Sequence, residues 1–188
     1  MNNFNKMQID NDFELVEKFV SGDETAFNLL VRKYQKKIYW HARQMLGDHH
    51  DADEITQEVL IVMYNKLKTF GFKSSLYTWI YKIVSTRSLN QIRRKKLKRL
   101  VTFDTADEKE FSSKHDIIQD IANRDKLEKV NNALDKLPAK QRQIFVMRNY
   151  DQLSYEEISE ITGKSVGGLK ANYFHALKKI LELVNEKD

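Results

Sequence analysis

The sequence predicts an all-α protein of two small helical domains joined by a flexible acidic linker. Apolar residues recur at three- and four-residue spacing along most of the chain, which is typical of amphipathic helices. One Pro and six Gly in 188 residues leave long stretches without a helix breaker. Between the two periodic parts, Ser, Thr, Asp and Glu dominate. We therefore expect a first domain at 1–97, a linker at 98–123 and a second domain at 124–188.

Four helices are expected in the first domain. A Ser21–Glu24 capping box begins the second helix, and Gly47 ends it. The third starts near Asp51, and Ser74 or Ser75 caps the fourth. The residues expected to face inward are Phe13, Val16, Phe19 and Val20 in the first helix; Phe27, Leu30, Val31, Tyr34, Ile38, Ala42 and Met45 in the second; Ile55, Val59, Leu60, Met63 and Leu67 in the third; and Leu76, Trp79, Ile80, Ile83 and Val84 in the fourth.

The second domain contains the pattern of a helix-turn-helix. An apolar stripe (Leu127, Val130, Leu134, Leu137) ends at Pro138, and a helix with Ile144, Phe145 and Met147 follows. Ser154 and Glu157 then form a second capping box, Gly163 suits a turn with positive φ, and Ser165 can cap the last helix. In such motifs the second helix reads bases in the major groove. The alternative is an ordinary helical hairpin with solvated lysines.

Composition argues against several classes of function. The chain has no Cys, so it offers no disulfide, no thiolate nucleophile and no Cys-based zinc site. The sequence shows no Ser/His/Asp array and no glycine-rich phosphate loop, so we expect neither an enzyme, nor catalytic residues, nor a cofactor. No apolar run reaches membrane-spanning length and the N-terminus is polar, which favours a cytoplasmic protein.

The stretch HHDADEITQEV, from His49 to Val59, invites a metal-site interpretation. Asp51, Glu54 and Glu58 fall on one helical face. A di-metal bundle, however, needs carboxylates and a Glu-x-x-His pair from other helices, and the sequence supplies none. We therefore expect no metal, and favour an acidic face that is solvated or docks a basic partner.

Charge is strongly segregated along the chain. The net charge is +5, yet Val59–Phe103 holds eleven Lys and Arg and no Asp or Glu. Tyr77, Trp79 and Tyr81 precede its main cluster of cations. Aromatic rings can stack on unpaired bases while cations follow phosphates, so this pattern favours single-stranded nucleic acid. The alternative is that Trp79 and Tyr81 belong to the hydrophobic core and the basic run is a solvated helix end.

These motifs resemble a known family. DADEITQEVLIVMYNKL, FKSSLYTWIYKIV and RRKK closely resemble region 2 of bacterial sigma-70 family factors of the extracytoplasmic-function (ECF) group. The stretch ALDKLPAKQRQIFVMRNYDQLSYEEISEITGKSVGGLKANYFHALKKIL is similar to their region 4. The resemblance covers the chain from about Asp23. It implies an alternative sigma factor that binds core RNA polymerase, recognises −35 and −10 promoter elements and promotes strand opening.

The resemblance also implies partners and residues. The polymerase clamp helices would contact Asp51, Glu54, Gln57 and Glu58, and the flap would lie near Phe145–Leu153. The linker would run towards the RNA exit path, and an anti-sigma factor is a further partner common in this group. The −10 element would contact Phe70, Phe72, Lys73, Ser74, Ser75, Tyr77, Thr78, Tyr81, Thr86, Asn90, Arg93, Arg94, Lys95 and Lys96, with the helix reaching Arg99. The −35 element would contact Ser165, Gly168, Lys170, Ala171, Asn172, His175, Lys178 and Lys179.

The chain departs from the family pattern in both DNA-binding segments. Thr86 stands where Asn is typical, and Asn90 where Asp is. In the last helix Gly168 replaces Thr, while Asn172, His175 and Leu177 replace Arg, so this helix carries fewer cations than usual. The sequence leaves two other classes as alternatives. A DNA-binding regulator that does not dock on polymerase would leave the aromatic loop and the acidic helix without a role. An RNA-binding protein would leave the helix-turn-helix unexplained.

Overall fold

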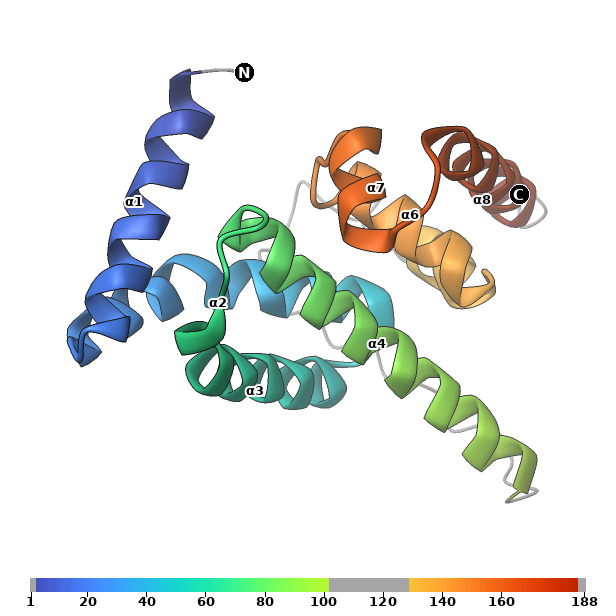
Figure 1. Ribbon diagram of the computed structural model, residues 1–188. Helices are drawn as coiled ribbons and strands as arrows, with labels where there is room; N and C mark the ends of the chain where they lie inside the picture. The colour runs from blue at the N-terminus through green and yellow to red at the C-terminus, as the bar shows by residue number, and fades with distance from the viewer. Residues whose placement is uncertain (1–2, 102–128, 186–188) are drawn as a thin grey trace, which may run out of the picture.

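The computed structural model describes residues 3–101 and 129–185, and those residues form helices without any strand (Figure 1). The expected all-α fold of two small helical domains is confirmed. The predicted linker lies outside the described residues, except that helix α4 continues to Val101, past the expected boundary at residue 97. The first domain contains α1 (Asn3–Val20), α2 (Glu24–Leu46), α3 (His49–Lys66), the 3₁₀ turn η1 (Leu67–Thr69) and α4 (Leu76–Val101).

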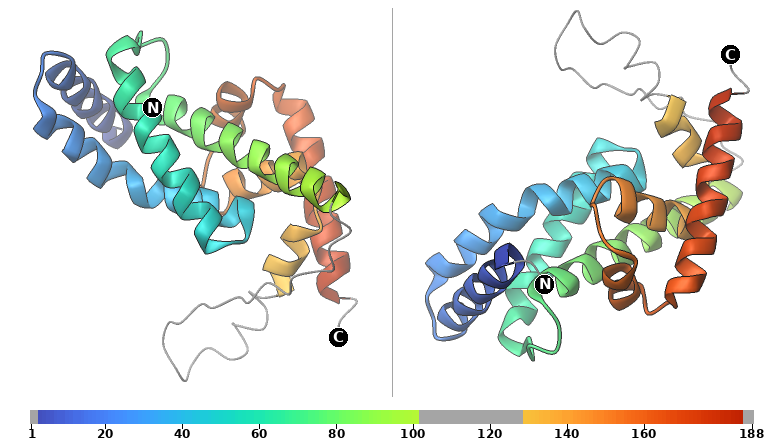
Figure 2. Two further views of the ribbon diagram at one scale, coloured as in Figure 1. Left: turned by 90° about the horizontal axis from the view of Figure 1, so that it is seen from below. Right: turned by 90° about the horizontal axis from the view of Figure 1, so that it is seen from above.

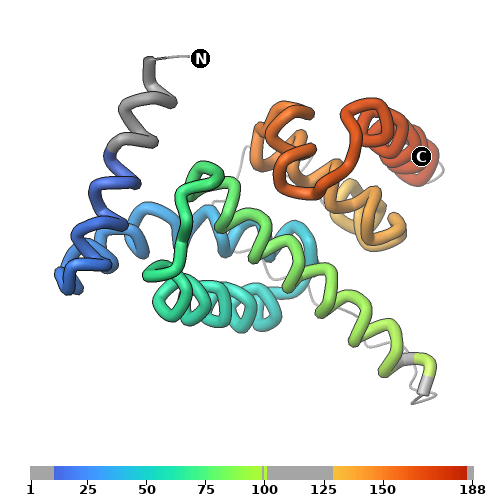
Figure 3. The backbone as a smooth tube through the Cα atoms, viewed as in Figure 1, coloured from blue at the N-terminus to red at the C-terminus, as the bar shows by residue number. Residues whose placement is uncertain are grey.

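The core of the first domain lies between α2, α3 and α4, and α1 packs across α2 and η1 (Figure 3). The side chains of Tyr34 and Ile38 from α2, Met63 from α3 and Ile80 from α4 are fully buried there. Most of the predicted stripe positions face inward as expected. Val20 does not: it is 47% exposed, because α1 ends at this residue and its last turn leaves the core.

Two predicted helix starts are wrong by two or three residues. The N-cap of α2 is Asp23, whose carboxylate accepts a hydrogen bond from the Thr25 backbone N–H at 2.9 Å, so Ser21 forms no capping box. The N-cap of α3 is Asp48 rather than a residue near Asp51. Both Asp side chains accept hydrogen bonds from N–H groups in the first turn, which have no partner within the helix. The sequence spacing had assigned this capping role to neighbouring residues.

The predicted C-terminal end of α2 and the predicted N-terminal cap of α4 are both present. Gly47 ends α2 at φ 70°, in the left-handed conformation that favours glycine. For α4, Ser75 is the residue that caps: its hydroxyl accepts from the Thr78 backbone N–H at 3.0 Å.

The second domain consists of a helical segment at 129–135 followed by α6 (Ala139–Asn149), α7 (Tyr155–Thr162) and α8 (Val166–Asn185). The Ser154–Glu157 capping box is present in full, and Gly163 turns the chain at φ 70°. The Ser165 hydroxyl accepts from the Gly168 N–H at 3.2 Å at the start of α8. Leu169 is fully buried and holds α8 against α7. The predicted helix-turn-helix therefore forms.

The two domains are packed against each other. In Figure 1 and both views of Figure 2, α6 and α7 lie beside the N-terminal half of α4, while the C-terminal end of α4 extends beyond α3 and α6 in Figure 1. Contacts join α4 to α7, α4 to α6 and α2 to α6. In contrast, α8 packs mainly on α6 and α7, within its own domain.

Candidate polymerase and nucleic-acid interfaces

The outer face of α3 is open to solvent and mixes polar with apolar side chains. Of the four residues predicted to bind polymerase, Glu54 and Gln57 are exposed. Ile61 and Tyr64, which the sequence reasoning missed, extend the same face and are 60% and 43% exposed. Residues 54, 57, 61 and 64 follow helical spacing, so a second, outward stripe could have been recognised from the sequence.

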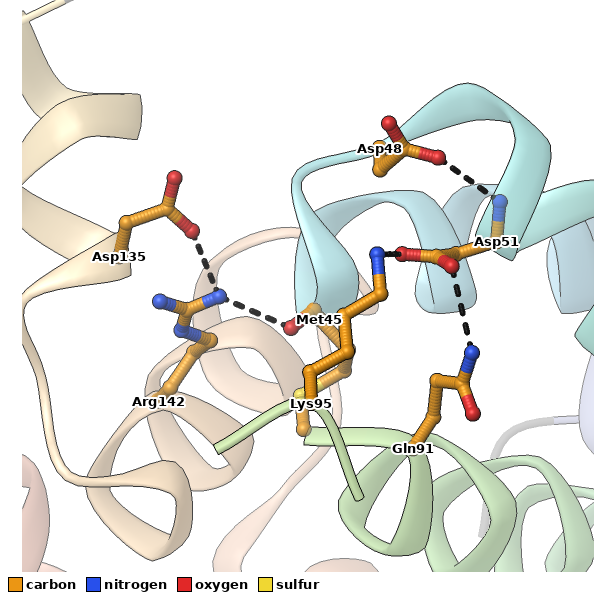
Figure 4. A network of polar contacts seen from close by, with 7 residues as sticks. All are labelled: Met45, Asp48, Asp51, Gln91, Lys95, Asp135 and Arg142. Atoms are coloured by element: carbon orange, nitrogen blue, oxygen red, sulfur yellow. Dashed lines mark hydrogen bonds and ion pairs between the residues drawn. The ribbon is translucent and has the colours of Figure 1, made fainter. Parts of the chain in front are cut away.

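The other two predicted polymerase-binding residues face α4 instead. Asp51 is only 8% exposed and forms an ion pair with Lys95, while the Gln91 side-chain amide donates to it at 3.2 Å (Figure 4). Glu58 forms an ion pair with Arg87 of α4. These carboxylates therefore join α3 to α4, and Lys95, predicted to bind DNA, is already engaged by a carboxylate.

Aromatic rings in tilted and edge-to-face contacts hold the loop between η1 and α4. Phe70 is buried, with its ring 5.3 Å from Trp79 and 5.1 Å from Phe72. Phe72 has φ 52°, is 42% exposed and reaches Phe13 of α1 at 4.9 Å. A left-handed conformation at Phe is uncommon and marks a loop held by its neighbours. Of the remaining predicted loop residues, Lys73 is exposed and Ser74 and Ser75 are half-buried.

Tyr77 and Tyr81, predicted to stack on bases, face the second domain. Their rings are stacked with centroids 4.3 Å apart, and Tyr81 is 2% exposed in a cluster with Ile144 and Met147 of α6. Burial, with the nearby Asp151 carboxylate, raises the pKa of both phenols well above the ordinary value. Thr78, between them, is also buried. In this arrangement Tyr81 presents no face to DNA, and Tyr77 is half-buried against the same cluster.

The middle and C-terminal parts of α4 present polar and cationic side chains to solvent. A groove of about 390 Å³ runs between α3 and α4, and its lining includes Trp79, Arg87, Asn90 and Arg94. The predicted DNA-binding residues that are exposed here are Thr86, Asn90, Arg93, Arg94 and Lys96. Because this part of α4 carries no carboxylate, its exposed cations can bind along a phosphate backbone.

The exposed face of α8 is only modestly cationic. Lys170, Ala171, His175, Lys178 and Lys179 are exposed as the −35 prediction requires. Phe174, which that prediction omitted, is 63% exposed on the same helix.

Other members of the predicted −35 set are turned towards the helix itself. The Asn172 side-chain amide donates to the Gly168 carbonyl at 2.7 Å, so it is half-buried along the helix, and Gly168 and Ser165 form the cap.

Lys178 lies 3.9 Å from Glu182, an exposed pair of little energetic value.

Polar groups also cross the domain interface. Fully buried His41 of α2 lies between the Ser85 hydroxyl, 2.9 Å from Nε2, and the Asp151 carboxylate, 2.6 Å from Nδ1. Arg142 of α6 donates to the Met45 carbonyl at 2.9 Å and pairs with Asp135 at 2.8 Å (Figure 4). Burial lowers the pKa of Arg142, which Asp135 opposes. Sequence reasoning missed these residues because the contacts that join the two domains, His41–Asp151 and Arg142–Met45, connect positions 110 and 97 residues apart in the chain.

Within the described segments, His, Asp and Glu form no group of three that could hold a metal ion. None of the helices in those segments is long and apolar enough to span a membrane.

Comparison with protein-family models matches residues 30–98 to Sigma-70 region 2 and residues 127–180 to Sigma-70, region 4. Among curated proteins, the chain is 31% identical to the RNA polymerase sigma-H factor of Pseudomonas aeruginosa, over 90% of this chain and 91% of the relative. It is 30% identical to the ECF sigma factor SigW of Bacillus subtilis (82% and 87% covered). Identity to the ECF sigma-E factor of Escherichia coli is also 30% (90% and 92% covered).

Solved structures share the fold. A structure of CnrH in complex with the cytosolic domain of CnrY matches with a TM-score of 0.71 and 20% identity, covering 95% of this chain and 99% of CnrH. The sigma factor RpoE of Bartonella quintana, in complex with the anti-sigma factor NepR, matches with a TM-score of 0.68 and 20% identity, covering 85% and 96%. The chain therefore belongs to the ECF group of the sigma-70 family: it is a transcription initiation factor, not an enzyme, that binds core RNA polymerase, recognises −35 and −10 promoter elements and promotes strand opening.

Proposed function

We propose that the chain divides these tasks among three surfaces. The outer face of α3, with Glu54, Gln57, Ile61 and Tyr64, binds the clamp helices of polymerase. The 70–75 loop and α4 bind the −10 element, and α8 reads the −35 element. The observation that supports this division is the presence of two separate cationic helices, α4 and α8, in different domains, each with its own exposed side.

The −10 surface has two parts that act differently. Exposed Arg93, Arg94 and Lys96 neutralise backbone phosphates of the duplex, without regard to sequence. The aromatic loop, with Phe72 at its surface, receives an unstacked base of the non-template strand. Base capture that uses Tyr77 or Tyr81 requires the second domain to move away, because α6 and α7 cover these rings. We infer that productive binding involves separation of the two domains.

Salt dependence tests the phosphate role. The variant Arg93→Ala/Arg94→Ala, assembled with core polymerase, should bind every promoter more weakly, and the slope of log K against log salt should become less steep by about 2. The matched control is Arg32→Ala/Lys36→Ala, which removes two exposed cations of α2 and should leave the slope unchanged. Equal slopes for the two variants would exclude α4 as a phosphate-binding surface.

The −35 assignment is tested separately. Lys170→Ala and His175→Ala should change base preference only at the −35 element, because their side chains stand on the exposed side of α8. Selection from a promoter library with holoenzyme measures this. A change of preference at −10 would contradict the assignment.

We also propose that the factor works in the cytoplasm, where bacterial polymerase and chromosome meet, and that an anti-sigma factor regulates it. The second proposal is supported by the CnrH and RpoE structures, whose factors share this fold and were solved as complexes. Copurification of the chain with a partner encoded beside it, competed by core polymerase, tests this; a partner that polymerase does not displace would contradict it.

A further inference from the structure

A second pocket, of about 250 Å³, lies at the interface between the two domains. Lys82 and Thr86 of α4 form one side. Lys140 and Gln143 of α6, Thr162 at the end of α7 and Lys164 in the following turn form the other. Neither domain contains the pocket alone, so it exists only while the domains are packed together.

The charge in this pocket is unbalanced. Three lysines line it, and none of its lining residues is an Asp or Glu. Among the described residues, none of the three ammonium groups forms an ion pair. Burial first, and the neighbouring Lys140 second, lower the pKa of Lys164, which indicates that its charged form is disfavoured in the protein alone. Lys140 and Lys164 are neighbours within the second domain, and closing the domains adds Lys82 of the first domain to the same pocket. Bringing this third positive charge to the pocket costs free energy that a counter-anion would offset.

The backbone adds to the positive field. Helix α6 begins at Ala139 after Pro138, and no side chain caps its first N–H groups. Lys140 is in that first turn, so the uncapped, partially positive end of the helix lies beside the pocket. The Gln143 amide adds a further donor to the lining, whereas the hydroxyls of Thr86 and Thr162 donate to the carbonyls of Lys82 and Ile158 in their own helices. Ammonium groups, an amide and a helix N-terminus are groups that bind phosphate.

We propose that this pocket binds a phosphate group, which bridges Lys82 of the first domain to Lys140 and Lys164 of the second. Because the anion binds only the closed arrangement, it stabilises that arrangement by mass action. Inorganic phosphate, pyrophosphate and the phosphates of a nucleotide share this chemistry. The proposal concerns the closed protein and does not depend on the promoter-binding roles assigned above.

The full chain can be titrated with inorganic phosphate, pyrophosphate and ATP, each compared with chloride at equal ionic strength. Thermal unfolding should show Tm raised by about 2 to 4 °C at saturation. Because the natural chain has no Cys, dyes on Asn28→Cys and Asn185→Cys report the separation of the domains. Energy transfer should rise with the anion and not with chloride. The order of affinities identifies the source: a preference for ATP indicates a nucleotide, and a preference for pyrophosphate or phosphate a free anion.

The variant Lys140→Gln/Lys164→Gln should lose the response, with pyrophosphate affinity reduced about tenfold or more, while its Tm in chloride stays equal or rises because the repulsion is gone. Lys36→Gln/Arg32→Gln, on exposed α2, is the matched control and should respond like the natural protein. The proposal is overturned if phosphate acts no differently from chloride, or if the double variant keeps the full response. It is also overturned if that variant loses only affinity for duplex DNA, since the lysines would then serve the DNA backbone.

Discussion

The outer face of α3 and the first turns of α4 belong to one domain but differ in their exposure to solvent. The α3 face is open, with Ile61 60% exposed, whereas Tyr81 of α4 is 2% exposed beneath α6 and α7. The surface proposed to bind polymerase is thus available in the closed molecule, and part of the surface proposed to bind DNA is not. The difference suggests an order of events in which polymerase docks first and the domains separate before the −10 element is captured.

Among variants that test this difference in exposure, Tyr81→Ala should have the largest effect on stability. Removing the ring leaves a cavity among Ile144, Met147 and Ile158 and should destabilise the closed protein by roughly 3–5 kcal/mol. Denaturant unfolding should show a lower midpoint, and dyes in the two domains should move apart. If the dyes stay together at full stability, the aromatic cluster does not hold the interface.

Asp151→Ala should have the next largest effect, about 1–3 kcal/mol, because buried His41 loses its carboxylate partner. The chain offers a matched control in the exposed pair His49–Asp53, 3.2 Å apart. Asp53→Ala should change stability by no more than about 0.5 kcal/mol. Urea unfolding measures both losses of stability. If the two variants lost similar amounts, burial at the interface would not strengthen the His41–Asp151 pair.

Alkaline pH should destabilise the closed protein through the phenols of the same interface. Burial raises the pKa of Tyr77 and Tyr81, so the closed protein keeps these protons after the unfolded chain has released them. Their contribution is therefore complete below about pH 10, the ordinary phenol pKa, and is lost as pH rises above it, by about 1.4 kcal/mol per unit for each group. Urea unfolding between pH 9 and 11 measures the slope. Tyr81→Phe should reduce it, and an unchanged slope would argue against this origin.

The smallest change in stability is expected on the outer face of α3. Ile61→Ala should alter the free energy of unfolding by no more than about 0.5 kcal/mol, because the side chain is mostly in solvent. Its affinity for core polymerase should fall by about 1–2 kcal/mol if it lies in the centre of that interface. Competition with the natural factor for core enzyme measures this. A stable variant with unchanged affinity would remove Ile61 from the polymerase surface.

Local chemistry made much of the fold predictable. Ser154, Glu157, Gly163 and Ser165 act through neighbours within four residues, so their spacing alone was enough to predict the helix-turn-helix, and the structure confirms it. The predicted apolar stripes are confirmed for the same reason, except for Val20, which is exposed, and Leu127, which lies outside the described residues. The helix starts at Asp23 and Asp48 were misplaced because several residues near each start can cap, and the choice depends on small differences in backbone path.

Site residues were harder to predict because a helix has several faces and the sequence does not say what covers each. The family resemblance implies that Asp51 contacts polymerase and Lys95 contacts DNA. In the closed protein the two side chains pair with each other across 44 positions, a pairing that no local pattern shows. Phe174 and Ile61 are in none of the predicted sets, and both are exposed.

By itself, then, the sequence determined the helices, the two domains and the family, since these follow from periodicity, capping and motif order. Only the tertiary structure decided that the domains close on each other, that His41 meets Asp151 across 110 positions, and that Tyr81 is buried and Tyr77 half-buried at the interface. Such contacts depend on the path of the whole backbone, which no local pattern encodes. The aromatic residues that precede the cations of α4 consequently serve the closed interface first, and can serve DNA only when it opens.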